Sequence, residues 1–363
     1  MKVLVVGTGG SIVSGISTAT DEMARTLASL GHGAERLDAG VRMRRRANRL
    51  NVENLLAVLA DSAAVGRRAW RGRADVVWIH AIGVPTLPAL RALAMVAAAR
   101  VTGRLAVVQF HAFGLERTVA EGSRRLRAAV RAIAALAGAM VVVHEEAAEA
   151  LRAVATGSPV HVLPNWVQVP DEVTTPSQQP PLRLVFVGGL VGRKGVPQLL
   201  EAMRALNDLA IELRLVGGAG EDGPAALEGL IVAAGDLVSA GCVGFAGELD
   251  GEGVRAELRA AHLLVLPSRA EGMPIAMLEA MAEGRAVLVS DAGNMRSVVE
   301  AAGCGWVLPD CRPETIASRL RWVAEHPVAL AEASARAGRT AAALYSPAAQ
   351  HPRIEAVLTS LGK

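Results

Sequence analysis

Short apolar runs alternate along the chain with longer segments rich in Ala, Leu and Arg, and this alternation limits the folds available to it. In the first half the apolar runs cover residues 3–6, 76–79, 105–110, 140–143 and 160–163. Runs of this length are typical of buried strands, and the segments between them have helical length. Strands that alternate with helices predict a parallel sheet with helices on both faces. The sequence therefore predicts an α/β, doubly wound architecture.

A polar stretch that contains prolines divides this pattern into two halves. Residues 171–181 lack apolar runs, and the alternation resumes with strand-like runs at 182–187, 212–216, 263–266, 286–290 and 305–308. A length of 363 residues also fits two domains at roughly 150 residues each. We predict Rossmann-like domains over residues 1–170 and 182–346, a linker over 171–181, and a helical C-terminal stretch over 347–363. The two domains are expected to face a central cleft, with ligands at the carboxyl ends of the strands.

Composition excludes several classes of protein. Hydrophobic residues make up 52% and charged residues 20% of the chain, so neither disorder nor a fibrous repeat fits. Aromatic residues make up only 3% and lie scattered along the chain. Proteins that stack single-stranded nucleic acid need several aromatics on one basic surface. Nucleic acid is therefore not an expected partner.

Cysteine use and hydropathy point to the cytoplasm. Cys242, Cys304 and Cys311 form no Cys-x-x-Cys motif and no even set, so no disulfide framework or zinc site is predicted. The start of the chain has no signal-peptide pattern. The longest apolar run, 132–143, is too short to span a membrane. We expect a cytoplasmic protein that is not exported and that can still touch a membrane surface.

Charge is unevenly divided between the two halves. Residues 1–170 hold 21 Lys and Arg against 12 Asp and Glu, whereas residues 171–363 hold 17 against 23. Arginines cluster at 42–49 and at 67–73. Two interpretations stay open. These arginines are solvated helix faces, or they form a surface for an anionic lipid or a phosphorylated acceptor.

Two glycine-rich turns are candidate phosphate sites. The first strand is followed by Gly7-Thr8-Gly9-Gly10-Ser11, where glycines allow a close approach of backbone N–H groups. This corner fails as a dinucleotide fingerprint because Ile12 stands where the third glycine is required. In the second half, Gly192-Arg193-Lys194-Gly195 precedes a helix predicted to begin near Val196. Two cations at a helix N-terminus predict a diphosphate clamp, the alternative being an exposed basic loop.

The segment 266–281 combines a strand end, a helix start and two carboxylates. Pro274 suits the first turn of a helix that is expected to run to about residue 283. The free N–H groups and the positive end of the helix dipole favour an anion there. Glu271 precedes this helix and Glu279 lies on it, so both can face one ligand. A carboxylate accepts two hydrogen bonds from a sugar or ribose diol.

These motifs together resemble the family 4 retaining glycosyltransferases of the GT-B fold. The resemblance covers nearly the whole chain and is most specific over residues 184–309. It implies that Arg193 and Lys194 hold the donor diphosphate, that Glu271 binds hydroxyls of the transferred sugar and that Glu279 binds the ribose. The resemblance adds further donor-binding positions in both halves: Gly9, Gly10, Asn165, Gly189, Gly272, Met273, Pro274 and Ile275.

The first domain contributes the remaining candidates. His111 matches the family's histidine near the reacting carbon, and Asn165 lies in the interdomain Pro-Asn motif. His80 and Ser14 are candidate acceptor-binding residues; for His80 a buried, hydrogen-bonded core histidine is the alternative. By the same resemblance, the last helix packs back towards the first domain.

The chain also departs from the family pattern. Gly188-Gly189-Leu190 stands where Gly-Arg-Leu is usual, and Arg193 is the candidate replacement for the missing arginine. Gly293-Asn294-Met295-Arg296-Ser297 stands where many members carry Gly-Gly-x-Pro-Glu. No Asp-x-Asp motif is present, and no pair of histidines has metal-ligand spacing, so no metal and no other cofactor is expected.

The resemblance implies retaining transfer of a hexose or N-acetylhexosamine from a nucleoside diphosphate sugar, with UDP expected by family frequency. The expected acceptor is a small soluble molecule, such as an antibiotic aglycone or an aminocyclitol of secondary metabolism. A peripheral-membrane enzyme acting on a lipid-linked acceptor is the alternative. A nucleotide-sugar epimerase and a non-catalytic nucleotide-sugar binder are the alternatives of another class. An NAD-dependent oxidoreductase is disfavoured by the failed dinucleotide fingerprint and by the lack of an acidic residue clearly placed for the ribose at the end of the second strand, where Asp38 is the only candidate.

Overall fold

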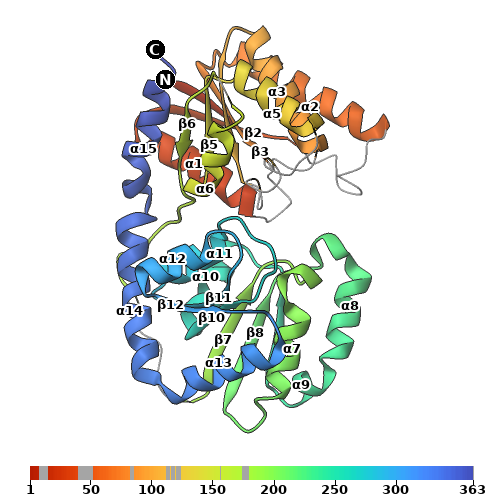
Figure 1. Cartoon of the computed structure of the whole chain (residues 1–363), viewed down its shortest axis with the longest axis vertical. Helices are drawn as coiled ribbons and strands as arrows, with labels where there is room; N and C mark the ends of the chain where they lie inside the picture. Colours follow the sequence, from red (N-terminus) through yellow and green to blue (C-terminus); the bar gives the residue numbers. More distant parts are fainter. Residues whose placement is uncertain are drawn as a thin grey trace. The chain divides into compact units, whose positions relative to one another are not determined.

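The computed structural model describes residues 1–7, 15–39, 52–81, 86–111, 115, 119, 124–155, 157–173 and 180–362. The chain divides into two compact units, the first formed by residues 1–166 with 347–363 and the second by residues 167–346. Each unit contains one six-stranded sheet (Figure 1). Neighbouring strands pair in parallel within both sheets, for example Val3 with Ala34 and Leu263 with Ala286. The predicted α/β class is confirmed.

The first sheet has the strand order β2-β1-β3-β4-β5-β6. Its strands are β1 (Lys2–Gly7), β2 (Gly33–Asp38), β3 (Val76–Ala81), β4 (Leu105–Phe110), β5 (Ala139–Val142) and β6 (Val160–Val162). The described helices of this unit are α1 (Gly15–Ser29), α2 (Val52–Arg71), α3 (Thr86–Val101), α5 (Arg124–Leu136), α6 (Glu145–Arg152) and α15 (Pro347–Ser360). The strand order reverses between β1 and β3, so ligand-binding loops are expected at their carboxyl ends.

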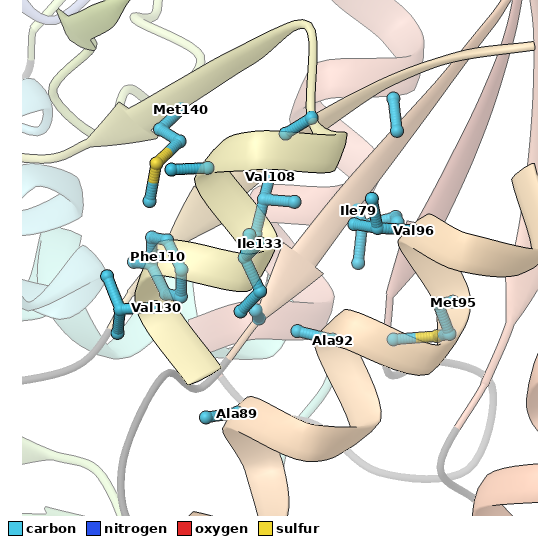
Figure 2. Close-up of a cluster of buried hydrophobic side chains, with 14 of the residues drawn as sticks. Ile79, Ala89, Ala92, Met95, Val96, Val108, Phe110, Val130, Ile133 and Met140 are labelled. Carbon is cyan, nitrogen blue, oxygen red and sulfur yellow. The ribbon is translucent and has the colours of Figure 1, made fainter. Parts of the chain in front are cut away.

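Side chains of the first sheet alternate between two cores because successive residues of a strand face opposite sides. On one side, Ile79, Val108 and Phe110 pack against α3 and α5 (Figure 2). On the other side, Trp78 and Val107 pack against side chains of α1 and α15. Both faces are buried and largely apolar, which is why these strands read as nearly continuous hydrophobic runs.

The second sheet has the order β12-β11-β10-β7-β8-β9. Its strands are β7 (Leu182–Val187), β8 (Ile211–Val216), β9 (Val243–Gly247), β10 (Leu263–Leu266), β11 (Ala286–Ser290) and β12 (Gly305–Leu308). Read from β9 this is the 3-2-1-4-5-6 order of a Rossmann sheet, and the order reverses between β7 and β10. The loops after these two strands carry the predicted donor site.

Helices and two short 3₁₀ turns surround the second sheet. They are η1 (Gly192–Lys194), α7 (Val196–Arg204), η2 (Gly220–Asp222), α8 (Pro224–Ala233), α9 (Gly235–Ser239), α10 (Gly251–Ala260), α11 (Ile275–Ala282), α12 (Met295–Ala302), α13 (Pro313–Glu325) and α14 (Pro327–Leu344). None of the described helices of either unit is long and apolar enough to cross a membrane.

Candidate functional site

Two loops meet at the point where the strand order of the second sheet reverses. The first runs from Gly188 to Gly195 after β7, and the second runs from Pro267 to Pro274 after β10. The Arg269 N–H donates a hydrogen bond of 2.8 Å to the carbonyl oxygen of Arg193, which ties the loops together. In doubly wound sheets, ligands bind in the crevice that such a reversal creates.

Glycine is required where these loops touch. Gly195 has a φ of +74°, and a Cβ atom there would lie 2.1 Å from the carbonyl oxygen of Pro267. Gly293 has a φ of +58°, and a Cβ atom there would lie 2.2 Å from the carbonyl oxygen of Gly272. Any larger residue would push the loops apart. Gly195 therefore sets the spacing between the loop 188–195, called the basic loop below, and the loop after β10. Gly293, in the turn after β11, sets the spacing between that turn and Gly272.

Lys194 and Glu271 form an ion pair across the two loops, between Nζ and Oε1. The side chains are only 15% and 9% exposed, so both charges have lost most of their water. Breaking a buried ion pair is costly, but forming one stabilises a fold little compared with an apolar packing of similar volume. The pair lies after the carboxyl ends of β7 and β10, where the strand order reverses and doubly wound sheets bind ligands, so its position points to a role in binding.

Arg193 is more exposed and is held by a neighbouring turn. Its Nε forms an ion pair with Oε1 of Glu221, and its Nη1 donates to the carbonyl oxygen of Ala270 at 3.3 Å. Asp222 accepts a hydrogen bond of 2.9 Å from the N–H of Gly192. Two carboxylates of η2 thus hold the basic loop. Glu221 and Asp222 belong to none of the motifs recognised in the sequence, because they lie in a separate turn after β8.

The N-terminus of α11 points to the same place as the basic loop. Pro274 was predicted in the first turn of the helix, but it takes the N-cap position, one residue before α11 begins. No side chain of the described residues caps this helix. Backbone N–H groups at an uncapped N-terminus and the helix dipole favour an anion. The N–H of Asn294 donates to the carbonyl oxygen of Gly272 at 3.1 Å and so supports the turn from behind.

Five other predicted donor-site residues lie on this part of the second unit. Gly189 follows β7, and a Cβ atom there would lie 3.6 Å from Cα of Gly220. The turn before α11 contains Gly272 and the buried Met273, and buried Ile275 opens the helix. Glu279 lies on the body of α11 and is partly exposed. Their roles in donor binding stay predictions.

The first unit places His80, His111 and Asn165 together. His80 is the second-last residue of β3, and His111 follows the adjacent strand β4. Nδ1 of His80 lies 2.8 Å from Nε2 of His111, and the rings stack with centroids 5.0 Å apart. The side chain of Asn165 hydrogen-bonds with His111. The interpretation of His80 as a buried, hydrogen-bonded histidine fits this geometry, because the residue is only 5% exposed and its Nδ1 is engaged by His111.

Burial sets the charge state of both histidines. Desolvation lowers the pKa of His111 to about 4, against a smaller raising effect of the Asn165 hydrogen bond. The pKa of His80 lies well below its usual value, mainly because the ring is buried and, to a smaller extent, because His111 is its neighbour. Both imidazoles are therefore neutral at neutral pH. A neutral imidazole can donate at one ring nitrogen and accept at the other.

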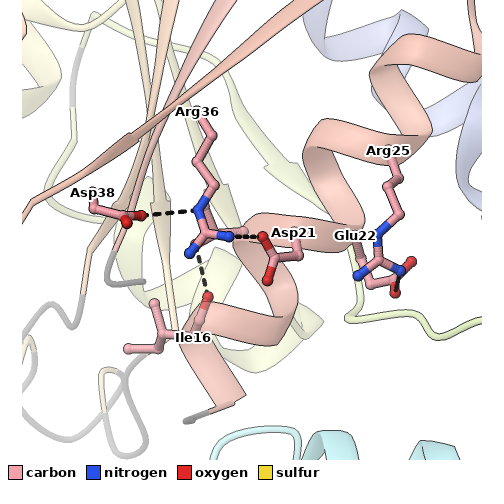
Figure 3. Close-up of polar contacts among 7 residues, drawn as sticks. Ile16, Asp21, Glu22, Arg25, Arg36 and Asp38 are labelled. Atoms are coloured by element: carbon pink, nitrogen blue, oxygen red, sulfur yellow. Dashed lines mark hydrogen bonds and ion pairs between the residues drawn. The ribbon is translucent and has the colours of Figure 1, made fainter. Parts of the chain in front are cut away.

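Some predictions fall elsewhere. Gly9, Gly10 and Ser14, and the arginine cluster at 42–49, lie outside the described residues. Asp38 forms a 2.9 Å ion pair with Arg36, which also pairs with Asp21 (Figure 3). An acid engaged in this way is a poor ribose acceptor for NAD. Among the described residues, no group of three or more His, Cys, Asp or Glu side chains is arranged to hold a metal ion.

Two parallel, doubly wound α/β domains with these loops define the GT-B fold of glycosyltransferases. Sucrose-phosphate synthase from Thermosynechococcus elongatus superposes with a TM-score of 0.79 at 16% identity, over 99% of each chain. Anabaena HepE, solved in complex with UDP and glucose, gives a TM-score of 0.73 at 18% identity, over 99% of this chain and 100% of HepE. At these identities the likeness establishes the fold.

Residues 172–342 match the model of the family described as glycosyl transferases group 1. This match covers almost the whole second unit. The assignment to family 4 within that group stays a prediction.

Curated relatives are glycosyltransferases as well. A teichuronic acid biosynthesis glycosyltransferase (TuaC) of Bacillus subtilis, named as putative, is 37% identical over 31% of this chain and 26% of its own length. D-inositol 3-phosphate glycosyltransferase of Streptomyces avermitilis is 34% identical over 44% of this chain and 34% of its own length. Alpha-D-kanosaminyltransferase of Streptomyces kanamyceticus is 27% identical over 49% of this chain and 46% of its own length. The chain therefore matches less than half the length of these relatives.

Proposed function

We propose that this chain is a retaining, metal-independent glycosyltransferase that uses a nucleoside diphosphate sugar as donor. The observation that carries the proposal is the Lys194–Glu271 ion pair beside the uncapped N-terminus of α11, at the strand-order reversal of the second sheet. A cation and free N–H groups suit a diphosphate, and an adjacent carboxylate suits sugar hydroxyls. The match of residues 172–342 to glycosyl transferases group 1 supports the same reaction class.

The donor roles follow from this chemistry. Lys194 and Arg193 hold the diphosphate, and the N–H groups around Gly272 and Ile275 add hydrogen bonds to it. Glu271 accepts hydrogen bonds from the transferred hexose or N-acetylhexosamine, and Glu279 from the ribose. We take UDP as the nucleotide; HepE, which has the same fold, was solved with UDP.

The groups that bind the diphosphate also stabilise the negative charge that develops on it during the reaction. As the bond to the anomeric carbon breaks, negative charge grows on the leaving diphosphate, where the cations and the α11 dipole stabilise it. This accounts for transfer without a metal. His111, neutral because burial lowers its pKa to about 4, is assigned to a hydrogen bond with the transferred sugar. Retention proceeds on the front face, with the departing phosphate oxygen taking the acceptor proton.

For the acceptor we propose a small soluble molecule, such as an antibiotic aglycone or an aminocyclitol of secondary metabolism, in the cytoplasm. One relative is named for D-inositol 3-phosphate, a small polar acceptor, and another for kanosamine transfer. A second candidate is a lipid-linked acceptor. The specific observation that favours it is an exposed apolar face on α2, described below.

Ligand-induced thermal shifts with UDP, GDP, ADP, TDP and NAD, each with and without magnesium, test the donor assignment. A ligand at roughly 100 times its dissociation constant adds about 2.7 kcal/mol of stability. We expect a magnesium-independent shift with one nucleoside diphosphate. A shift with NAD alone, or none with any of the five, would contradict the proposal.

Turnover then separates the classes of function. A transferase releases the nucleoside diphosphate only when an acceptor is present, and proton NMR of the product shows the donor's anomeric configuration. Release of an altered free nucleotide sugar without an acceptor identifies an epimerase, and binding without turnover identifies a silent binder. Lys194→Ala and Glu271→Ala should each reduce turnover about 100-fold or more. Arg204→Ala, which removes an exposed ion pair with Asp236, is the matched control.

A further inference from the structure

The outer face of α2 carries large apolar side chains. Val52, Leu55, Leu56 and Leu59 are 75%, 55%, 60% and 57% exposed, and Trp70 is 65% exposed. Residues 52, 55, 56 and 59 share one helical face, and Trp70 follows Val52 by five turns at roughly 3.6 residues a turn. These five residues are called the α2 apolar face below.

The inner face of the same helix is made of smaller or polar side chains. Its buried residues are Asn54, Ala57, Val58, Asp61, Ser62, Val65 and Ala69. Four leucine and valine side chains and a tryptophan thus lie outside, while alanines and an ion-paired aspartate lie inside. Single exposed apolar residues are ordinary, but a stripe along one helix marks an interaction surface.

Arginines are numerous on the helices of this side of the first sheet. Helix α3 packs against both α2 and α5 on one face of the sheet (Figure 1). Together the three helices contain nine arginines and two acidic residues, Glu53 and Asp61; Arg91 pairs with Asp61, and Arg68 pairs with Glu35 of β2. Arg67 and Arg71 are exposed within one turn of Trp70 on α2. The exposed Arg100 and the 87% exposed Val101 end α3, which packs against α2.

We propose that the α2 apolar face and these arginines dock the first domain on an anionic lipid surface. Apolar side chains enter the boundary between headgroups and acyl chains, and arginines bind lipid phosphates. Tryptophan at the edge of such a face suits the membrane interface. The charge selects this occupant over a second copy of the chain, because two copies of one basic face repel each other. Nucleic acid is disfavoured because Trp70 is the single aromatic residue of the α2 apolar face.

The proposal does not depend on the transferase assignment, because binding to lipid is measured without any sugar donor. Co-sedimentation with vesicles of phosphatidylglycerol and phosphatidylcholine in equal parts tests it, against phosphatidylcholine alone. We expect the full chain to sediment with the anionic vesicles, and to do so about tenfold less when salt rises from roughly 0.05 M to roughly 0.5 M.

Variants locate the contact. The double variant Leu56→Glu/Leu59→Glu should weaken vesicle binding about tenfold or more, and Trp70→Ser should weaken it as well. Val232→Glu and Val328→Glu place the same charge at positions 80% and 71% exposed on the second unit, and they should bind like the wild type. Arg67→Glu/Arg71→Glu should remove the preference for anionic vesicles.

Three results would overturn the proposal. They are no sedimentation with anionic vesicles, sedimentation unchanged by Leu56→Glu/Leu59→Glu and Trp70→Ser, and a dimer in solution that these substitutions dissociate without any vesicle binding. A thermal shift with UDP, measured on every variant, reports the donor site separately. If the chain binds vesicles but no nucleotide, the lipid-docking proposal is supported and the proposed transferase function is contradicted.

Discussion

Nδ1 of His80 lies 2.8 Å from Nε2 of His111, and the two ring planes differ by 11°. Two neutral imidazoles can form this hydrogen bond, since one donates and the other accepts. Two imidazolium rings cannot, because neither has an acceptor. Nε2 of His80 has no partner among the described residues. The hydrogen bond therefore requires at least one neutral ring, and burial, which lowers the pKa of both histidines, keeps both rings neutral at neutral pH.

Acidification should destabilise the first domain through this pair. The pKa of His111 falls from 6.5 to about 4 on folding, so between these values the unfolded chain binds more protons than the folded one. Stability must then fall as pH drops through that window. We expect the Tm to fall by several degrees between about pH 7 and about pH 5, and His111→Gln to reduce this fall. His326→Gln, at an exposed histidine, should keep it. Equal slopes in all three proteins would exclude the pair as the cause.

The ion pair in the second domain predicts a different result from single and double substitutions. Lys194→Met leaves the carboxylate of Glu271, a residue only 8% exposed, without its partner. We expect a loss of about 2–3 kcal/mol in the free energy of unfolding. Adding Glu271→Gln removes the isolated charge and should recover most of that loss. Neither protein should show a thermal shift with UDP. Denaturant unfolding of both variants measures this difference, and equal stability of the two would show that the unpaired carboxylate of Glu271 is not what destabilises Lys194→Met.

Most strands could be predicted from the sequence, because buried strands of a parallel sheet carry continuous apolar residues. All ten strand-like runs correspond to strands, and two of them are the edge strands β6 and β12. Two other edge strands, β2 and β9, were missed. Their sequences, Gly-Ala-Glu-Arg-Leu-Asp and Val-Gly-Phe-Ala-Gly, are interrupted by charged residues or glycines. A search for apolar runs does not detect strands of this kind.

The candidate site was only partly predictable for a related reason. Motifs identified Lys194 and Glu271, because glycine and proline punctuation marks where loops follow strands. The bond between His80 and His111 needs the register of β3 on β4, in which His80 pairs with Gln109. The sequence also did not show that the α2 apolar face is exposed. Apolar spacing on a helix shows that one face is distinct, and it leaves open whether that face meets the core or the outside.

Gly195 should tolerate no side chain. At a φ of +74° and with the carbonyl oxygen of Pro267 2.1 Å from a Cβ position, Gly195→Ala strains the backbone and separates the two loops. We expect the free energy of unfolding to fall by about 2 kcal/mol or more. The thermal shift with UDP should be lost as well. Gly229→Ala is the control, since no atom lies within 4 Å of its Cβ position. Alanine there, inside α8, should be neutral or slightly stabilising. Thermal melts of the two variants decide the matter, and a Gly195→Ala protein as stable as Gly229→Ala would contradict the role assigned to the glycine.

The last helix should be part of the first domain's core although it follows the second domain in sequence. Ile354, Val357 and Leu358 of α15 are almost completely buried in the cluster that contains Met23 of α1 and Trp78 of β3. Nε2 of His32 also lies 3.0 Å from Oε1 of Glu355, which ties the start of the domain to its last helix. Removing α15 would therefore open one face of the first sheet to water.

Ile354→Ala should cost about 2–4 kcal/mol, because it leaves a cavity between α15 and the sheet. Leu344→Ala removes a similar volume from a side chain that is 53% exposed, so it should cost much less. Truncation after residue 346 should unfold the first domain and leave the UDP shift of the second, because the truncated residues belong to the first unit alone. Near-ultraviolet circular dichroism during denaturation, read beside the UDP shift, distinguishes these outcomes. If the truncated chain melted like the full one, α15 would be dispensable and the apolar contacts of Ile354 would contribute nothing measurable to the fold.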